Sequence, residues 1–348
     1  LRFPEFTGEW QCKAIEKVAP LQRGFDLPTQ NLVEGIYPVI YSNGILQHHD
    51  KYKCEAPGLI TGRSGTIGKF TYIDSGFYWP HNTSLWVTDF CGNCPKFIYY
   101  LYQTVHIEQF STGSGVPTLN RNDVHRYKTS VPTAIVEQEK IAKFLSILDE
   151  RIVTQNKIID KLQSLIKGIN CKIFALIQGN EYRLGDIATI TNGNSNVQDA
   201  SVEYRVGLYP FFDRSEDVKY LPTFLFDKES IIYPGEGTEF MPRYYNGKFA
   251  LHQRCYAICD FNEAVNPQFL YFFLKTQNSY FIRNAVGSTV PSLRLDTFQK
   301  LKVVIPSKET QYSVYSFLST LEQKLDVENS IMKMLLCQKR YLLRQMFI

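Results

Sequence analysis

The residues that most resemble a chemical site lie in a glycine-rich segment, residues 62–70, which reads GRSGTIGKF. A phosphate-binding loop of the Walker A type needs glycine at the position of Arg63 and serine or threonine at that of Phe70. The segment therefore does not predict a nucleotide site. A glycine loop that carries Arg63 and Lys69 after a strand suits close approach to the backbone or a groove of DNA. A tight turn with solvated charges is the alternative interpretation.

Three other groups of residues suggest catalysis or metal binding, and each has a simpler explanation. Residues 266–269 (NPQF) differ by one residue from the Asn-Pro-Pro-Phe motif of adenine methyltransferases, but no glycine-rich S-adenosylmethionine loop precedes them. Cys91 and Cys94 form a C-x-x-C without a second pair at zinc-finger spacing. His48 and His49 are adjacent, so their side chains would point apart on a strand. We predict neither a catalytic site nor a metal site.

Basic and amide side chains alternate with aromatic residues in loop-rich segments such as residues 209–215 (YPFFDRS) and 243–254. Arginine pairs well with guanine, and glutamine or asparagine with adenine, in the major groove. The aromatic residues themselves are expected in the core. The predicted DNA-contact residues are Arg214, Ser215, Arg243, Lys248 and Gln253 in the second half of the chain, and Ser42, Asn43, Arg63, Lys69, His81 and Asn82 in the first.

The chain contains an internal repeat of half its length. Residues 113–120 (GSGVPTLN) recur as residues 287–294 (GSTVPSLR), a shift of 174 residues from Pro117 to Pro291. An apolar run precedes each copy and follows a proline, Pro95 or Pro267, that is well placed for the first turn of a helix. A long helical pattern follows each copy. The interiors, roughly residues 20–95 and 190–265, hardly resemble each other. A repeated frame with different interiors is expected if two copies of one scaffold recognise two different targets.

The interiors are predicted to be rich in β-strands. Residues 37–41 lead to a turn at Asn43-Gly44, and residues 59–60 and 231–233 read as strands that open into glycine loops. In the second half, Asn246-Gly247 predicts a two-residue hairpin turn.

Heptad spacing predicts a long helix after each unit. From Ile141 to Leu176 the apolar residues follow one another at steps of three and four, with a polar interruption at Gln155. The second pattern, residues 314–346, is interrupted at Glu328 and Lys339. Because the second unit must follow the first helix, the two helices are expected to pack as an antiparallel coiled coil with a recognition domain at each end.

The composition is that of a globular protein, with 44% hydrophobic residues, 14% aromatic residues and a formal net charge of +4. This charge permits a nucleic-acid partner without requiring one. No apolar run has the length of a membrane span, and the N-terminal residues do not read as a signal peptide. We expect a soluble, cytoplasmic protein that does not bind a membrane.

With these features the sequence resembles, over essentially its full length, the specificity subunits of type I restriction-modification enzymes. The resemblance rests on residues 1–6 (LRFPEF) with Trp10, on the Gly-Ser-x-Val-Pro-x-Leu segment before each helix, on residues 132–145, and on residues 209–215. The second unit departs from the family pattern at its helix start, where Glu309-Thr310-Gln311 replaces Glu137-Gln138.

The resemblance implies an α+β fold with two tandem α/β target-recognition domains, residues 1–133 and 180–307. Spacer helices would follow at residues 134–179 and 308–348. Each domain would read one half of an interrupted, asymmetric site in double-stranded DNA. The helices would dock two methyltransferase subunits, which bind the S-adenosylmethionine, and the full complex would include restriction subunits. The chain itself would be non-catalytic and hold no cofactor.

Two alternatives remain. The chain could be the recognition portion of a fused restriction or methylation enzyme with its own catalysis, which would need catalytic carboxylates with a lysine, or a cofactor loop. It could also be a coiled-coil scaffold without DNA recognition, against which the divergent, aromatic and basic interiors argue.

Overall fold

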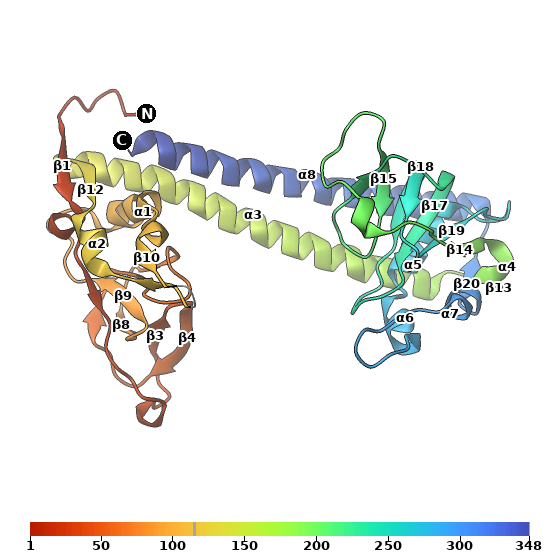
Figure 1. Ribbon diagram of the computed structural model, residues 1–348, viewed down its shortest axis with the longest axis horizontal. Helices are drawn as coiled ribbons and strands as arrows, with labels where there is room; N and C mark the ends of the chain where they lie inside the picture. The colour runs from red at the N-terminus through yellow and green to blue at the C-terminus, as the bar shows by residue number, and fades with distance from the viewer. Residues whose placement is uncertain (114–115, 348) are drawn as a thin grey trace. The chain divides into compact units, whose positions relative to one another are not determined.

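The computed structural model describes residues 1–113 and 116–347 and divides the chain into two compact units. Unit 1 comprises residues 1–156 and 330–348, and unit 2 comprises residues 157–329. The long helices α3 (Ile135–Leu176) and α8 (Lys308–Met346) lie where the heptad patterns predict them, and each contributes one half to each unit (Figure 1). Ser114 and Gly115 of the first Gly-Ser segment lie outside the described residues.

Unit 1 is built mainly from short strands. Its strands are β1 (Trp10–Ala14), β2 (Leu21–Arg23), β3 (Tyr37–Tyr41), β4 (Gly44–His49), β5 (Cys54–Glu55), β6 (Gly58–Gly62), β7 (Phe70–Ile73), β8 (Phe77–Pro80), β9 (Ser84–Val87), β10 (Ser111–Thr112), β11 (Thr118–Leu119) and β12 (Lys128–Pro132). Its helices before α3 are η1 (Ile15–Lys17), η2 (Thr29–Asn31), α1 (Pro95–Val105), η3 (Ile107–Phe110) and α2 (Arg121–Arg126). The strand orders are β2-β9-β6-β7, β4-β3-β8-β5, β1-β12 and β10-β11.

Unit 2 joins most of its strands in one six-stranded sheet of order β14-β19-β17-β18-β15-β16. Its strands are β13 (Asn180–Arg183), β14 (Thr189–Asn192), β15 (Tyr209–Phe212), β16 (Lys219–Leu221), β17 (Phe226–Pro234), β18 (Arg243–Leu251), β19 (Cys255–Cys259) and β20 (Lys302–Ile305). Its helices before α8 are α4 (Leu184–Ile187), η4 (Val197–Asp199), α5 (Pro267–Lys275), α6 (Asn278–Asn284) and α7 (Leu295–Gln299). β13 pairs with β20 as β1 pairs with β12.

The two interiors share one strand frame although their sequences differ. β6 pairs antiparallel with β9 as β17 pairs with β19, and β3 runs parallel to β8 as β15 runs parallel to β18. Pro57 separates β5 from β6 where β17 is continuous, and residues 74–76 separate β7 from β8 where β18 is continuous. The repeat therefore extends through both interiors, which the sequence comparison did not reveal.

The hairpin predicted at Asn246-Gly247 is wrong. Both residues lie within β18, where Asn246 pairs with Glu229 and Gly247 with Lys228 of β17. The pairing of β17 with β18 covers residues 226–232 and 243–249, and this long ladder outweighs the local preference of an Asn-Gly pair for a turn. Gly247 has a φ of +130°, which residues with a Cβ atom rarely adopt, so the path of the strand requires glycine here.

The predicted helix starts at Pro95 and Pro267 are confirmed, since these prolines begin α1 and α5. Phe97 of α1 and Phe269 of α5 are fully buried in the cores of their units. The end of a long helix covers each of them: the rings of Phe97 and Phe347 lie 5.2 Å apart in unit 1, and those of Phe269 and Phe174 lie 5.3 Å apart in unit 2.

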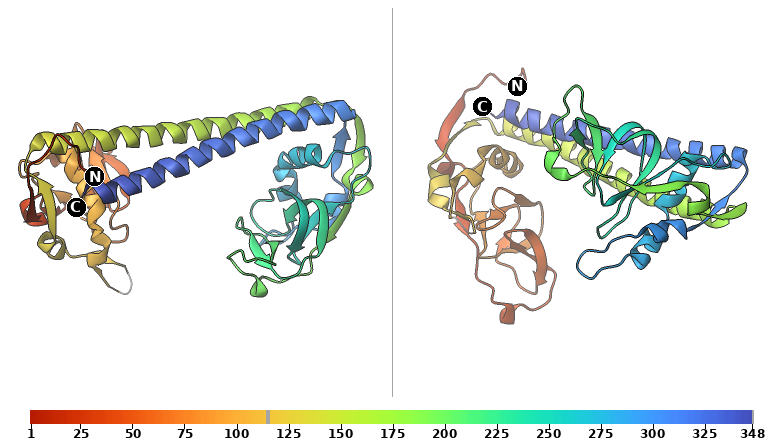
Figure 2. Two further views of the ribbon diagram at one scale, coloured as in Figure 1. Left: turned by 90° about the horizontal axis from the view of Figure 1, so that it is seen from above. Right: turned by 45° about the vertical axis from the view of Figure 1, so that its right-hand side comes forward.

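Within each unit the two helix halves run antiparallel and lie side by side (Figure 2). In unit 1 the start of α3, with Ile141 and Leu145, packs in one core with Met346 near the end of α8. In unit 2, Phe174 near the end of α3 packs against the same core as Val314 near the start of α8. The predicted seam residues are buried or half-buried except Leu176, which is 69% exposed, so its placement on the seam is wrong. The α3 helix ends at this residue.

The polar seam residue Lys339 has a specific partner in unit 1. Its Nζ lies 2.7 Å from Asp149 Oδ1, and the Tyr100 hydroxyl donates a hydrogen bond of 2.8 Å to Asp149 Oδ2. The ion pair compensates the charge of a lysine on a largely apolar seam, and it requires one register of α8 against α3 in this unit.

One buried glutamine fixes the start of each long helix. Gln138 Oε1 accepts a hydrogen bond from the Cys94 N–H (2.8 Å), and its Nε2 donates to Asn93 Oδ1 (2.8 Å) and the Pro132 carbonyl (2.9 Å). Gln311 repeats this geometry with the Asn266 N–H (2.7 Å) and the carbonyls of Ala264 (2.9 Å) and Pro306 (3.0 Å). The departure of the second unit at Glu309-Thr310-Gln311 therefore preserves the glutamine.

Residues 1–10, on which part of the family resemblance rests, contact the start of α3. The Arg2 guanidinium pairs with the Glu137 carboxylate at 2.7 Å, and the Trp10 indole N–H donates to the same carboxylate at 3.1 Å. Phe3 contacts Phe144 edge to face. Thr310 stands at the position of Glu137 in the second repeat, so this contact belongs to unit 1.

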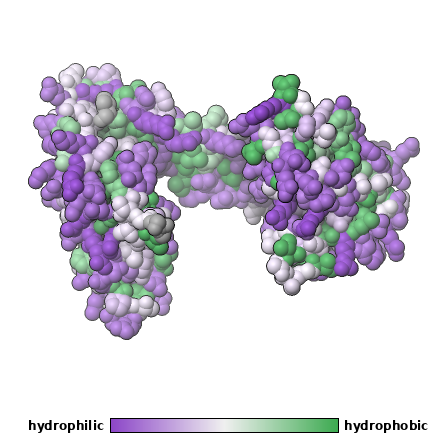
Figure 3. Space-filling view, viewed as in Figure 1, coloured by the Kyte–Doolittle hydropathy of each residue, from purple (hydrophilic) through white to green (hydrophobic). Residues whose placement is uncertain are grey.

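The long helices also carry exposed apolar side chains, and Figure 3 shows hydrophobic residues gathered on them beside the largely hydrophilic surfaces of the interiors. These side chains include Ile147, Val153, Leu165, Val327, Met334 and Leu336, all more than two-fifths exposed. Among the described residues, no helix is long and apolar enough to cross a membrane.

Candidate nucleic-acid interface

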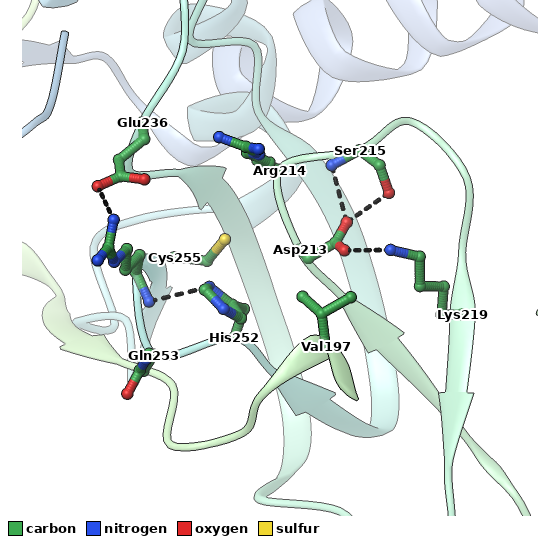
Figure 4. Close-up of a pocket in the computed structure, with 10 residues that line it drawn as sticks. Val197, Asp213, Arg214, Ser215, Lys219, Glu236, His252, Gln253 and Cys255 are labelled. Carbon is green, nitrogen blue, oxygen red and sulfur yellow. Dashed lines mark hydrogen bonds and ion pairs between the residues drawn. The ribbon is translucent and has the colours of Figure 1, made fainter. Parts of the chain in front are cut away.

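A cavity of about 500 Å³ in unit 2 brings together several of the predicted DNA-contact residues (Figure 4). Arg214, Ser215 and Gln253 line it, together with Asp213, Lys219 and His252. The segment after β15 supplies residues 213–215, and the turn between β18 and β19 supplies residues 252–254. Parallel pairing of β15 with β18 places these two segments at the same edge of the sheet.

Asp213 organises the first of these segments. Its Oδ1 accepts a hydrogen bond of 2.7 Å from the Ser215 N–H, and Lys219 Nζ donates to its Oδ2 at 2.6 Å. Burial opposes ionisation of Asp213, but the hydrogen bonds from Lys219 and Ser215 hold the pKa of its carboxyl group below the ordinary value. The carboxylate is therefore charged and neutralises Lys219, so it fixes the loop that presents Arg214.

Arg254 is paired as well, with 2.7 Å between its guanidinium and Glu236 Oε1. Arg214 has no hydrogen bond or ion pair with the described side chains, so its guanidinium is available to a ligand. Arg243 donates to the Ser215 carbonyl and lies in an adjoining cavity of about 680 Å³. Lys248 lies outside both cavities, where its Nζ is 3.9 Å from Asp227 and 4.8 Å from the centre of the Phe224 ring.

In unit 1 the equivalent turn between β8 and β9 gathers four of the predicted residues, Ser42, Arg63, His81 and Asn82. Thr83 is the common partner: its Oγ1 accepts from the Ser42 N–H (3.3 Å) and its carbonyl accepts from the Arg63 N–H (2.9 Å). His81 Nδ1 lies 3.0 Å from the same Oγ1, and the Asn82 carbonyl accepts from the Arg63 guanidinium at 3.5 Å.

Asn43 and Lys69 are not joined to this group by any contact among the described residues. Asn43 is exposed in the turn between β3 and β4, and Lys69 is exposed just before β7. The Lys69 carbonyl accepts a hydrogen bond from the Thr61 hydroxyl at 3.0 Å, which fixes the backbone of the glycine loop but not the ammonium group.

His81 and His252 occupy the same position of the shared frame. The N–H of His81 donates to the Ile40 carbonyl and that of His252 to the Phe212 carbonyl, both at 2.9 Å. In each turn the histidine Nδ1 accepts from the N–H two residues later, that of Thr83 (3.3 Å) or Arg254 (3.2 Å). Burial lowers the pKa of both imidazoles, and the neutral form is the one that accepts these hydrogen bonds.

We expect the protein to lose stability when the pH falls below about 6.5. The pKa values of His81, His125 and His252 are lowered by burial, so each contributes stability that is complete above the unfolded-state pKa and is lost as the pH falls through the folded-state value. His125 Nε2 likewise accepts the Leu21 N–H at 2.9 Å. The free energy of unfolding measured by urea denaturation should be lower at pH 5.5 than at pH 7.5. A His252→Gln variant should show a smaller pH difference, and an unchanged difference would contradict the assignment.

Several residues of these cavities were not predicted from the sequence. Asp213, Lys219, Glu236, His252 and Arg254 line the cavity in unit 2, and Arg23 and Arg121 line the one in unit 1. Asp213 precedes the predicted Arg214 and Arg254 follows the predicted Gln253, so their positions in the sequence could have identified them as cavity residues. Arg23 and Arg121 are far from Arg63 in sequence, and only the pairing of β2, β6 and β9 brings the first of them near it.

The arrangement suits binding to an anionic surface with hydrogen-bonding edges, because unpaired arginines stand beside fixed hydroxyl and amide groups. Among residues 1–113 and 116–347 no cluster of three or more histidine, cysteine, aspartate or glutamate side chains could hold a metal ion.

Comparison with known proteins agrees with this arrangement. The sequence model of the family described as "Type I restriction modification DNA specificity domain" matches residues 7–164 and 179–335, one match to each repeat. The specificity subunit of the type I restriction enzyme EcoDI from Escherichia coli is 30% identical over 138 residues, which are 40% of this chain and 30% of that protein. The match thus spans about a third of the curated relative.

Two solved structures have the same fold over nearly their whole length. The S subunit of a type I restriction-modification system from M. genitalium gives a TM-score of 0.68 at 20% identity and covers 99% of this chain and 98% of its own. A structure from work on complex assembly and conformational transition of the type I R-M system gives 0.59 at 13% identity, with 98% of each chain covered. Since the family model matches both repeats and together they make up most of the chain, this protein belongs to the type I restriction-modification DNA specificity family and contains its domain twice.

Proposed function

We propose that the chain is the DNA-recognition subunit of a type I restriction-modification complex and that each domain reads one half of an interrupted, asymmetric site. The observation that carries this proposal is the shared strand frame with different side chains at its exposed turns. Arg214, Ser215 and Gln253 line the cavity of unit 2, whereas Ser42 and Asn82 lie at the equivalent turn of unit 1. Two copies of one scaffold with different polar side chains suit two different half-sites.

The long helices are proposed to dock two methyltransferase subunits. The support is their exposed apolar side chains, among them Val153 and Leu165 on α3 and Val327 and Met334 on α8. Apolar side chains in such numbers on a helix surface are typical of a contact with another protein. On this proposal the methyltransferase subunits bind S-adenosylmethionine, restriction subunits join the full complex, and this chain is non-catalytic and acts in the cytoplasm.

Exchange of one interior is expected to change one half of the recognised site and leave the other intact. The exchange takes residues 20–126 from a relative with another specificity, which preserves the pairing of β1 with β12 and the buried Gln138. Methylated positions in genomic DNA then reveal the recognised sequence. The matched control exchanges residues 190–300, inside the pairing of β13 with β20, and should change the opposite half. A simultaneous change of both half-sites in either chimera would contradict two independent readers.

A further inference from the structure

Three arginines in unit 1 stand at positions where the frame itself requires no arginine. In unit 1 the Leu119 N–H donates to the Arg63 carbonyl at 2.8 Å, and in unit 2 the Leu293 N–H donates to the Gly235 carbonyl at 2.8 Å. Arg63 therefore corresponds to Gly235 of unit 2.

The other two positions follow in the same way. Arg23 pairs with Leu85 as Asn192 pairs with Tyr256, and the partners Leu85 and Tyr256 are themselves equivalent in the frame. Arg121 is the first residue of α2, as Leu295 is of α7. Because a glycine, an asparagine and a leucine serve the same fold in unit 2, the three arginines of unit 1 are not needed for folding.

These arginines nevertheless line one cavity of about 440 Å³, together with Thr112, Thr118 and Asn120. The guanidinium groups of Arg23 and Arg63 donate to one acceptor, the Asn82 carbonyl, at 3.4 and 3.5 Å. Two like charges are thereby held side by side, which is unfavourable unless an anion lies between them.

Little of this positive charge is neutralised within the protein. Asp26 lies 3.4 Å from the Arg23 guanidinium and also accepts from the Asn82 amide, but it does not line the cavity. The Arg121 guanidinium forms no hydrogen bond or ion pair with the described residues, and the residues that line the cavity include no carboxylate. The cavity of unit 2 differs, since Asp213 and Glu236 neutralise Lys219 and Arg254 there.

We propose that Arg23, Arg63 and Arg121 form a binding site for a backbone phosphate of DNA in unit 1, whereas Asn192, Gly235 and Leu295 stand at the equivalent positions of unit 2. A guanine edge offers two acceptors and suits one bidentate arginine, whereas the oxygens of a phosphate accept from several guanidinium groups at once. Threonine hydroxyls beside the arginines supply further donors to such oxygens. This inference rests on the proposed function and adds that unit 1 contributes more of the salt dependence of binding.

The test measures binding of the full chain, in complex with its methyltransferase subunits, to the recognised duplex and to an unrelated duplex at several KCl concentrations. Arg23→Gln, Arg63→Gln and Arg121→Gln are each expected to weaken binding to both duplexes by the same factor. Each should make the slope of log Kd against log salt shallower by up to about 1. The double variant R23Q/R63Q should lose less than the product of the two single losses, because both arginines contact the same phosphate. Arg126→Gln is the matched control and should leave affinity and slope unchanged. Arg126 ends α2, the helix that Arg121 begins, and it is exposed and pairs with Asp123 at 3.3 Å.

The outcomes separate this inference from the proposed function. If the unaltered complex shows no preference for any duplex, the proposed function fails. If it binds specifically but a variant relaxes the preference at one base pair with an unchanged salt slope, that arginine reads a base and the phosphate site is overturned. Specific binding with no change in affinity or slope in any of the three variants overturns it as well. Thermal unfolding of each variant, expected to match the unaltered protein, confirms that the fold is retained.

Discussion

Replacing Gln311 by methionine is expected to lower the free energy of unfolding by roughly 2–4 kcal/mol. The buried Pro306 carbonyl loses a hydrogen bond at about 1–3 kcal/mol, and the less buried Asn266 N–H and Ala264 carbonyl lose theirs at a smaller cost. Gln311 is fully buried, and its amide bonds the Asn266 N–H and the carbonyls of Ala264 and Pro306. Methionine has a similar size, so it removes the hydrogen bonds without a large cavity. The loss is a large share of the roughly 5–15 kcal/mol that a domain has in total.

Urea denaturation measures this loss, and hydrogen exchange locates it. The backbone amides of α5 and the first turns of α8 should exchange faster in the variant, since these are the elements that Gln311 joins. Gln138→Met should act in the same way on α1 and α3 in unit 1. Gln323→Met, an exposed position on α8, is the matched control and should change the free energy by less than about 0.5 kcal/mol. Equal losses for Gln311→Met and Gln323→Met would contradict the role of the buried amide.

Lengthening both helices by one heptad is expected to widen the gap between the two recognised half-sites by about three base pairs. The insertions are placed after Asn156 in α3 and after Asn329 in α8, where the two units divide, so that the packing inside each unit is preserved. Seven residues add about 10 Å to a helix, and base pairs are stacked about 3.4 Å apart. The half-sites themselves should not change.

A selection of preferred duplexes from a library with variable spacers measures the gap. Insertion of two residues in each helix is the matched control: it rotates the apolar stripes of the two halves of each helix relative to one another and should impair binding to any spacer. If the lengthened protein keeps the original gap with full affinity, the helices do not set the distance between half-sites.

The repeat, both long helices and the starts of α1 and α5 could be predicted because each depends on a local pattern. Heptad spacing and a proline in the first turn act over a few residues, and they lie outside the divergent interiors. Lys339 was the weak position of its heptad pattern, and the structure pairs it with Asp149, a residue far away in sequence. A charge on a seam can be explained only when its partner is known.

The shared frame of the interiors could not be predicted, because it depends on backbone pairing and not on side chains. β17 is one strand, whereas its counterpart is divided by Pro57 into β5 and β6, so that alignment of the sequences fails at this point. The same pairing caused the wrong hairpin at Asn246-Gly247, where a long ladder outweighs a local preference. The arginine cavity could not be predicted for a related reason. Arg23 and Arg121 are far from Arg63 in sequence, and only the fold brings the three residues together.

The division of α8 between the two units has a consequence for synthesis of the protein. The ribosome makes all of unit 2 before it makes residues 330–347, and these residues complete the core of unit 1. Until then Phe97 lacks the ring of Phe347, and the core that contains Leu145 lacks Met346. Unit 1 is therefore the first unit to leave the ribosome and the last to be completed. Its apolar core residues stay accessible to chaperones while unit 2 is translated. A nascent chain interrupted before residue 330 would therefore leave the core of unit 1 incomplete although residues 1–156 are present.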